Sequence, residues 1–214
     1  MAGVFITFEG PEGCGKSTQV ARLAERLRDE GYDVVTTREP GGTPAGEAIR
    51  GILQHDTAGE DICAETETLL FEASRAQLVR HVIRPAIERG AIVLCDRFAD
   101  STTAYQGYGR GFDVEALLQL HAFALGETEP KLTLLLDIDV EEGFRRLQSR
   151  NAETQTGLDR MERESRAFHQ RVHDGYLAMA DRWPGRFSVV EGNRAPEAVH
   201  ADIWNLVLKA IRER

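Results

Sequence analysis

A glycine-rich segment with one lysine and two hydroxyl side chains occupies residues 10–18, GPEGCGKST. Its spacing matches the phosphate-binding loop G-x-x-x-x-G-K-[S/T], with Gly10, Gly15, Lys16 and Ser17 at the defining positions. In such a loop the glycines let backbone N–H groups turn toward phosphate oxygens, and the following helix N-terminus adds partial positive charge. Lys16 would neutralise the β- and γ-phosphates of a nucleoside triphosphate, and Ser17 would offer its hydroxyl to Mg²⁺. The predicted triphosphate site comprises Gly10, Pro11, Glu12, Gly13, Cys14, Gly15, Lys16, Ser17 and Thr18.

A second polar segment, DRFADSTTAYQGYGRG at residues 96–111, follows the apolar stretch AIVLC at residues 91–95. Asp96 stands where this strand ends, at the carboxyl edge of a sheet where α/β proteins bind their ligands. There it could hold Mg²⁺ through water, and Arg97 offers a planar fork of N–H donors that suits a phosphate. We predict that residues 96–111 form a loop that holds the acceptor of a phosphoryl group.

An aromatic ring and a guanidinium lie four residues apart in LLFEASRAQLV, at Phe71 and Arg75. On a helix the two side chains share a face and can touch one ligand. Phe71 alone would more often belong to a core, but the pair suits a base, with one ring for stacking and one donor fork for carbonyl oxygens. Further polar groups that could reach the same ligand are Ser101, Thr102, Tyr105 and Gln106.

Strands and helices alternate along the whole chain. Apolar runs predict strands at residues 4–9, 33–37, 91–95, 132–139 and 186–190. Helical spacing predicts helices at residues 16–31, 45–53, 66–90, 113–126, 140–150, 160–181 and 195–213, the third of them bent near Pro85. Because the strands are apolar on both faces, we expect a five-stranded parallel sheet between helical layers, an α/β fold with three layers in a single domain, 1–214.

The composition limits the classes of partner. The chain has 214 residues and a formal net charge of −9, which argues against nucleic acid or an anionic membrane as the main partner. No apolar run approaches the ~20 residues that span a bilayer, and the first ten residues do not resemble a signal peptide. Cys14, Cys63 and Cys95 show no spacing typical of disulfide frameworks or zinc sites, so a reducing cytoplasm is expected.

A phosphate-binding loop identifies the donor and leaves several protein classes open. A GTPase switch would need an NKxD motif for guanine, and the nearest segment, NRAP at residues 193–196, does not match. A motor or transporter ATPase would need more length. A small kinase fits better, because the chain carries a second set of basic residues for an acceptor.

The motifs together resemble those of bacterial thymidylate kinases. The blocks FEGPEGCGKST, TREPGGTPAGEAIR, LLFEASRAQLV, DRFADSTTAYQGYGRG and GLDRMERE follow that family's order and cover the chain as far as residue 164. The resemblance implies a P-loop NTPase fold of the nucleoside-monophosphate-kinase type. It also implies transfer of the γ-phosphate of ATP to dTMP with Mg²⁺, giving dTDP for dTTP synthesis, and a homodimer as the assembly.

The resemblance also implies roles for single residues. The dTMP-binding set would be Glu9, Arg38, Glu39, Pro40, Arg50, Phe71, Arg75, Arg97, Ser101, Thr102, Tyr105 and Gln106. Within it, Arg97 would hold the phosphate with Arg38 and Arg50, and Phe71 would stack on thymine. Arg75 would donate to thymine O4, and Thr102 and Gln106 would meet N3 and nearby groups. Tyr105 would lie against the deoxyribose. Ser17 would bind the metal directly, with Asp96 and Glu9 reaching it through water. Whether the Glu39–Pro40 bond is cis stays open.

If the chain is such a kinase, we expect catalysis to depend on Lys16, Arg97, Glu12 and a lid arginine. The variable positions of the phosphate-binding loop carry no arginine, so one is expected in a mobile lid at about residues 148–160. We assign that role to Arg150, place Arg146 against adenine, and expect Arg160 to pair with Glu162 or Glu164. An arginine at the transferring phosphoryl group is worth about 10³–10⁵ in rate in related NTPases.

Two further sequence features and one alternative enzyme have to be considered. His169 and His173 have the spacing of a metal pair but lack a third ligand, so a solvated helix face is expected. The segment ALLQLHAFALG, residues 116–126, is more apolar than one helix face needs, which suggests a subunit interface or plain core. The alternative enzyme, a deoxynucleoside kinase, would leave Arg38 and Arg50 without an acceptor phosphate.

Overall fold

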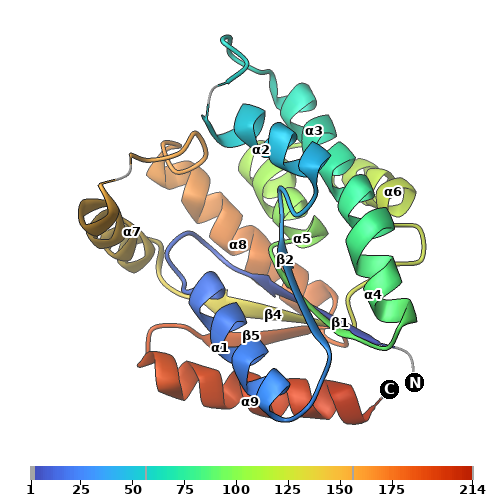
Figure 1. The fold of residues 1–214 in the computed structure, drawn as a ribbon. Helices are drawn as coiled ribbons and strands as arrows, with labels where there is room; N and C mark the ends of the chain where they lie inside the picture. Colours follow the sequence, from blue (N-terminus) through green and yellow to red (C-terminus); the bar gives the residue numbers. More distant parts are fainter. Residues whose placement is uncertain (1–2, 56, 156, 214) are drawn as a thin grey trace.

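The computed structural model describes residues 3–55, 57–155 and 157–213. Within them five parallel strands form one sheet in the order β2-β3-β1-β4-β5 (Figure 1). The strands are β1 (Val4–Glu9), β2 (Val34–Arg38), β3 (Ile92–Asp96), β4 (Leu132–Asp137) and β5 (Phe187–Glu191). The predicted α/β fold with its five-stranded parallel sheet is thereby confirmed.

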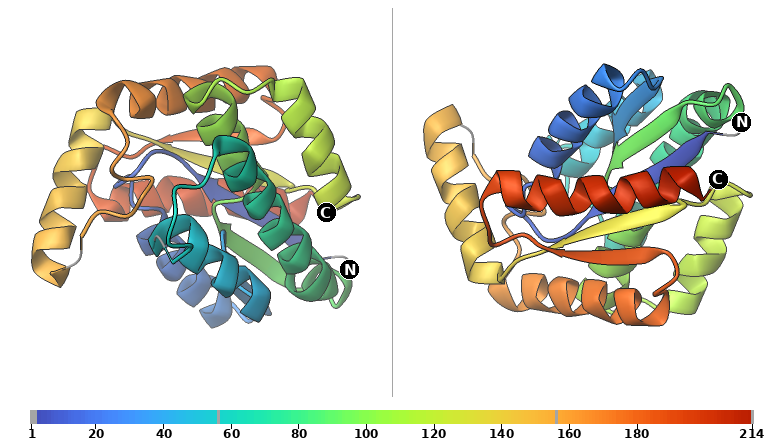
Figure 2. Two further views of the ribbon diagram at one scale, coloured as in Figure 1. Left: turned by 90° about the horizontal axis from the view of Figure 1, so that it is seen from above. Right: turned by 90° about the horizontal axis from the view of Figure 1, so that it is seen from below.

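Helices cover both faces of this sheet (Figures 1 and 2). They are α1 (Lys16–Asp29), α2 (Pro44–His55), α3 (Ala64–Leu78), α4 (Arg84–Glu88), α5 (Ala99–Thr102), α6 (Val114–Leu125), α7 (Val140–Thr154), α8 (Arg166–Arg182) and α9 (Pro196–Arg212). Two π-helical segments, η1 (Val79–Ile83) and η2 (Thr103–Gly109), continue α3 and α5. No helix in the described ranges is long and apolar enough to cross a membrane.

The two sides of each strand supply two separate cores. Ile6 and Phe8 of β1 point to the side covered by α1 and α9, where Leu23 and Val207 are fully buried. Phe5, the neighbour of Ile6, points to the opposite side, into a cluster with residues of η1 and α4. Alternating side chains that are all apolar let one strand serve both layers, which is why these strands read as continuous apolar runs.

The parallel register brings the carboxyl ends of the strands to one edge of the sheet. Asp96 at the end of β3 pairs with Phe8 of β1 and with Arg38 of β2. Asp137 and Glu191 end β4 and β5 in the same register. The segments that follow these strands therefore meet at this edge.

The acceptor segment at residues 96–111 is helical, so the prediction of a loop was wrong. α5 begins at Ala99 and η2 continues to Gly109, with the chain turning only at Arg110 to Asp113. The many hydroxyls and glycines suggested a loop, but the aromatic and small residues bury one side of this helix against α8. Tyr105 contacts Phe168 and Tyr176 edge to face. Tertiary packing here outweighs the weak helix propensity of the segment.

Three predicted helices differ most from the structure in their limits or regularity. The helix expected at 66–90 contains the π-helical η1 just before Pro85, whose missing N–H cannot complete the regular ladder. The helix expected from residue 160 begins only at Arg166, because Ser165 caps it by accepting from the Phe168 N–H. The helix expected to end at residue 150 extends to Thr154. The Glu39–Pro40 peptide bond is cis.

Candidate active site

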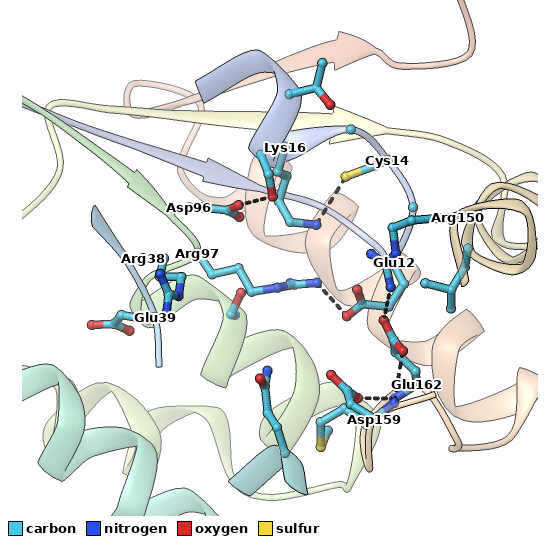
Figure 3. A pocket seen from close by; sticks show the side chains of 18 of the residues that line it. Glu12, Cys14, Lys16, Arg38, Glu39, Asp96, Arg97, Arg150, Asp159 and Glu162 are labelled. Carbon is cyan, nitrogen blue, oxygen red and sulfur yellow. Dashed lines mark hydrogen bonds and ion pairs between the residues drawn. The ribbon is translucent and has the colours of Figure 1, made fainter. Parts of the chain in front are cut away.

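A cavity of about 800 Å³ opens at the carboxyl edge of the sheet (Figure 3). Most of the predicted site residues line it. From the triphosphate set these are Glu12, Gly13, Cys14, Gly15, Lys16, Ser17, Thr18 and Arg146. From the dTMP-binding set they are Arg38, Glu39, Pro40, Arg50, Phe71, Arg97, Ser101, Thr102, Tyr105 and Gln106. The predicted metal residue Asp96 and the lid arginine Arg150 line the cavity as well.

The loop between β1 and α1 has the backbone geometry of a phosphate cradle. Gly10, Gly13 and Gly15 have φ values of 137°, 71° and 95°, which strain residues with a side chain. A Cβ at Gly13 would lie 2.2 Å from the Gly143 carbonyl oxygen, so α7 also requires glycine there. The Lys16 ammonium closes the loop by donating to the carbonyl oxygens of Gly10 (3.0 Å) and Pro11 (2.9 Å). Gly10 and Pro11 thus shape the cradle from outside the cavity lining.

Two oxygen groups that could hold a divalent cation lie side by side, Ser17 near the start of α1 and Asp96 at the end of β3. The Ser17 hydroxyl donates to Asp96 Oδ2 at 2.5 Å, and both residues line the cavity. Hydroxyl and carboxylate oxygens are the ligands that Mg²⁺ prefers, and it commonly keeps several waters. The pair fits the predicted metal site, with room for water and phosphate oxygens in the adjoining cavity.

Arg97 spans the space between the phosphate-binding loop and the acceptor side. Its φ of 68° is uncommon for a residue with a side chain, and its N–H donates to the Phe8 carbonyl oxygen at 2.9 Å. The guanidinium donates to Glu12 Oε1 at 2.6 Å (Figure 3). It also donates to the Tyr105 hydroxyl at 3.1 Å. The backbone and the side-chain partners together aim this cation into the cavity.

Glu12 is held ionised by these neighbours. Burial opposes its charge, but Arg97 and then Lys16 outweigh burial and lower the pKa of Glu12 to about 2. Its carboxylate also accepts from the Tyr105 hydroxyl at 2.7 Å. A residue of the donor loop thereby fixes two side chains of the predicted acceptor site.

The opposite wall carries two further cations that could meet an anion. Arg38 donates to both carboxylate oxygens of Glu47 at 3.0 Å, and Arg50 donates to the Pro40 carbonyl oxygen at 2.9 Å. Burial, and next the charge of Arg38, lower the pKa of Arg50. An acceptor phosphate placed between these arginines would relieve their mutual repulsion.

Two residues of the predicted dTMP-binding set, Arg75 and Glu9, lie outside the cavity lining. Arg75 is 1% exposed, and its guanidinium contacts Glu39, Glu72 and the Thr102 hydroxyl. Glu9 is fully buried, where it accepts from the Phe98 N–H at 2.7 Å and from the Ser101 hydroxyl at 2.6 Å. Through these bonds Glu9 fixes the start of α5.

The lid arginines differ in their surroundings. Arg150 lines the cavity, has a half-exposed side chain and donates to Glu162 Oε1 at 2.8 Å. Arg160 instead pairs with Glu67 and donates to the Leu53 carbonyl oxygen at 2.9 Å, so the expected pairing with Glu162 or Glu164 was wrong. Part of the predicted lid, residue 156, lies outside the described residues.

A group of cavity residues near the C-terminus escaped the sequence analysis. The segment between β5 and α9 lines the cavity with Gly192 and Arg194, and α9 adds Pro196 and Val199. Arg146 is anchored there by donating to the Gly192 carbonyl oxygen at 3.1 Å. These residues follow the carboxyl end of a predicted strand, where α/β proteins bind their ligands, and that position could have identified them from the sequence. From the lid side Asp159, Met161 and Glu162 also line the cavity.

The histidine pair of α8 does not lie on a solvated face, so that prediction was wrong. His169 is 2% exposed and lies edge to face against Phe144 and Phe168. His173 contacts Asp137 Oδ1 through Nε2 at 2.7 Å. Over the described ranges no group of three or more His, Cys, Asp or Glu side chains is placed to hold a metal ion.

Comparison with known proteins gives a consistent result. A family model described as thymidylate kinase matches residues 8–203. The chain is 52% identical over 208 residues to the thymidylate kinase of Thermomicrobium roseum, covering 97% of this chain and 96% of that one. It is 47% identical over 213 residues to the thymidylate kinase of Geobacter sulfurreducens, covering 99% and 100%. The crystal structure of thymidylate kinase from Ehrlichia chaffeensis superimposes with a TM-score of 0.76 at 33% identity, covering 97% of this chain and 99% of that one.

Proposed function

The chain belongs to the thymidylate kinase family, whose members phosphorylate dTMP to dTDP, and we propose that ATP and dTMP meet phosphate to phosphate in its cavity. The observation that carries this proposal is the placement of Lys16 and Arg97 in one cavity. Lys16 belongs to the cradle for a triphosphate, and Arg97 points into the space facing it.

The donor half would hold ATP between the phosphate-binding loop and the C-terminal segment. The triphosphate would lie on the backbone N–H groups of the loop, close to Lys16 and the N-terminus of α1. Adenine would lie against Arg146 beside Gly192, where the arginine is held by its bond to the Gly192 carbonyl oxygen. A planar guanidinium can stack on a base as well as bind an anion.

The acceptor half would hold dTMP between α3 and the acceptor helix. Its phosphate would lie among Arg97, Arg38 and Arg50, and its thymine ring would stack on Phe71. Thr102 and Gln106 would face the base. Arg75 contributes from behind the wall, because its donation to the Thr102 oxygen leaves the hydroxyl proton of Thr102 free to reach the ligand.

Ser17 and Asp96 would hold Mg²⁺ on the donor side, because their oxygens adjoin each other and the triphosphate cradle. When bound, such an ion neutralises charge on the β- and γ-phosphates. The protein itself supplies the remaining cations around the reacting groups.

In the transfer an oxygen of the dTMP phosphate attacks the γ-phosphorus, and the bond from that phosphorus to the β–γ bridging oxygen breaks. The products are dTDP and ADP, so atoms and electrons balance without a further reactant. Arg97 aims the acceptor phosphate, Glu12 holds Arg97, and Lys16 stabilises charge on the transferring group. Arg150 would add its charge when the lid segment at about residues 148–160 closes.

We extend the proposal to assembly and location. Phe123 of α6 is 91% exposed and Leu69 of the neighbouring α3 is 57% exposed, which supports a homodimer through these helices. Cys14, Cys63 and Cys95 are all free, and Cys63 is exposed, which supports a reducing cytoplasm.

A coupled ADP-release assay tests this function across dTMP, dUMP, dCMP, AMP, GMP and thymidine. We expect dTMP to give the highest kcat/KM and thymidine to give none above background. Turnover of thymidine without turnover of dTMP would contradict the proposal and would identify a deoxynucleoside kinase instead.

A further inference from the structure

Glu67, near the start of α3, is a buried carboxylate to which the mechanism above assigns no role. It is 1% exposed and lies behind the base-facing wall of the cavity. Oε1 accepts from Gln106 Nε2 at 2.7 Å and from Arg110 Nε at 2.6 Å. Oε2 accepts from an Arg110 terminal nitrogen at 2.9 Å and pairs with Arg160. Each carboxylate oxygen therefore faces donors from different segments of the chain.

The chemistry of this contact determines which way the Gln106 amide points. An ionised carboxylate can only accept hydrogen bonds, so the Gln106 group that faces Glu67 must be its NH₂. Burial opposes the charge of Glu67, but bonds from Arg110 and Gln106 outweigh burial and lower its pKa, so the carboxylate is ionised near neutral pH. No hydrogen bond between described residues occupies Gln106 Oε1. The group that Gln106 offers to the cavity is thus an acceptor.

We propose that Glu67 is a positioning residue for base selection, which holds Gln106 so that its carbonyl oxygen faces N3 of the acceptor pyrimidine. The proposal rests on dTMP being the acceptor. Thymine and uracil carry N3–H, a donor that this oxygen can accept. Cytosine has a bare acceptor at N3, so two lone pairs would face each other in a water-poor site. Sites built around such a bond reject an unmatched analogue strongly.

Replacing Glu67 by glutamine should reverse the orientation of the Gln106 amide. The Oε2 side of residue 67 faces two cationic donors, terminal nitrogens of Arg110 and Arg160, whereas the Oε1 side faces one, Arg110 Nε, together with Gln106. The glutamine oxygen should therefore stay on the Oε2 side. The new NH₂ of Glu67→Gln then faces Gln106 and needs an acceptor. Gln106 would turn its oxygen toward residue 67 and its NH₂ toward the base, where it matches the N3 acceptor of cytosine.

The test measures kcat/KM for dTMP, dUMP and dCMP in the wild type and in Glu67→Gln. We expect the dTMP/dCMP ratio to fall at least about tenfold, on the scale of one lost hydrogen-bond match. The dTMP/dUMP ratio should stay within about twofold, because both bases carry N3–H. Glu164→Gln is the matched control, since Glu164 pairs with Arg110 at 2.9 Å but has no bond to Gln106. It should leave both ratios unchanged.

A second variant protects the test against misfolding of a buried substitution. Glu67→Met combined with Arg160→Met removes one charge of each sign from the cluster and removes the acceptor that orients the Gln106 NH₂, so the dTMP/dCMP ratio should fall as well. A cycle with Gln106→Leu then identifies the route, because in that background Glu67→Gln should no longer move the ratio.

An unchanged dTMP/dCMP ratio in folded Glu67→Gln, or an equal fall in the Gln106→Leu background, would overturn the positioning role. These results are distinguishable from failure of the proposed function, in which the wild type itself would not turn over dTMP.

Discussion

The carboxylate of Glu12, in the donor loop, accepts a hydrogen bond of 2.6 Å from the guanidinium of Arg97, at the end of β3. The same oxygen accepts from the Tyr105 hydroxyl at 2.7 Å. Donor loop and acceptor helix are therefore joined through one side chain. We therefore propose that Glu12 helps to align the acceptor, in addition to any contact with the triphosphate.

Glu12→Gln should raise the KM for dTMP and lower kcat, each by about tenfold, because a neutral amide holds Arg97 less firmly and in-line transfer depends on its aim. The KM for ATP should change much less. Steady-state kinetics with each substrate varied in turn measures this. Glu115→Gln, which removes an exposed pair with Arg182, serves as the control and should change neither constant. A selective rise in the KM for ATP would contradict the alignment role.

The buried Glu9 should make stability depend on pH in an unusual direction. Burial, and next the charge of Asp100, raise the pKa of Glu9 from 4.5 to about 7. The folded protein holds this proton more tightly than the unfolded chain does. The contribution of Glu9 to the free energy of unfolding is therefore full below about pH 4.5 and is lost as the pH rises through 7.

The Glu9→Gln variant, which cannot ionise, should therefore gain stability relative to the wild type between pH 5 and pH 8, by at most about 3 kcal/mol. Urea denaturation of both proteins at several pH values gives the difference in free energy of unfolding. A constant difference across that range would show that Glu9 is ionised throughout in the folded protein.

The donor half could be predicted from sequence because its chemistry is local. Gly10, Gly15, Lys16 and Ser17 lie within eight positions of one another, and the flanking strand and helix follow from apolar periodicity alone. The five strands were found for the same reason. Their order was not derivable from the residues, since it depends on crossovers between distant segments.

The errors arose where distant parts of the chain meet. His169 and His173 do share a helix, but His169 is buried against Phe144 and Phe168 rather than solvated. Arg160 pairs with Glu67, more than ninety positions away, rather than with a carboxylate nearby in sequence. A helix register shows which side chains neighbour each other along the chain, but it does not show which buried partner competes for them.

Arg150→Ala should lower kcat at least tenfold, about 1.4 kcal/mol of barrier, with little change in the KM for dTMP. Arg150 lines the cavity and its side chain is half exposed, so it can approach the transferring phosphoryl group on closure. The matched variant Arg160→Ala should instead lower the melting temperature, because it leaves Glu67 without one of its partners. A large loss of kcat in Arg160→Ala with none in Arg150→Ala would reverse the assignment.

Phe71→Ala should weaken dTMP binding by roughly 1–3 kcal/mol, the scale of stacking between a base and an aromatic ring. The KM for ATP should barely change, because Phe71 lies on the acceptor wall. Calorimetric titration of dTMP gives the affinity directly. Equal weakening of ATP and dTMP would indicate a general loss of structure, which thermal melting would reveal.

The central claim is that Lys16 serves the donor and Arg97 serves the acceptor within one cavity, and titration of dTMP into two variants tests it most directly. Lys16→Ala should bind dTMP with an affinity within about threefold of the wild type while losing most of its turnover, because its charge acts on the donor phosphates. Arg97→Lys should bind dTMP at least about tenfold more weakly, because an ammonium lacks the two-pronged geometry of the guanidinium. Loss of dTMP affinity in Lys16→Ala together with unchanged affinity in Arg97→Lys would contradict the account.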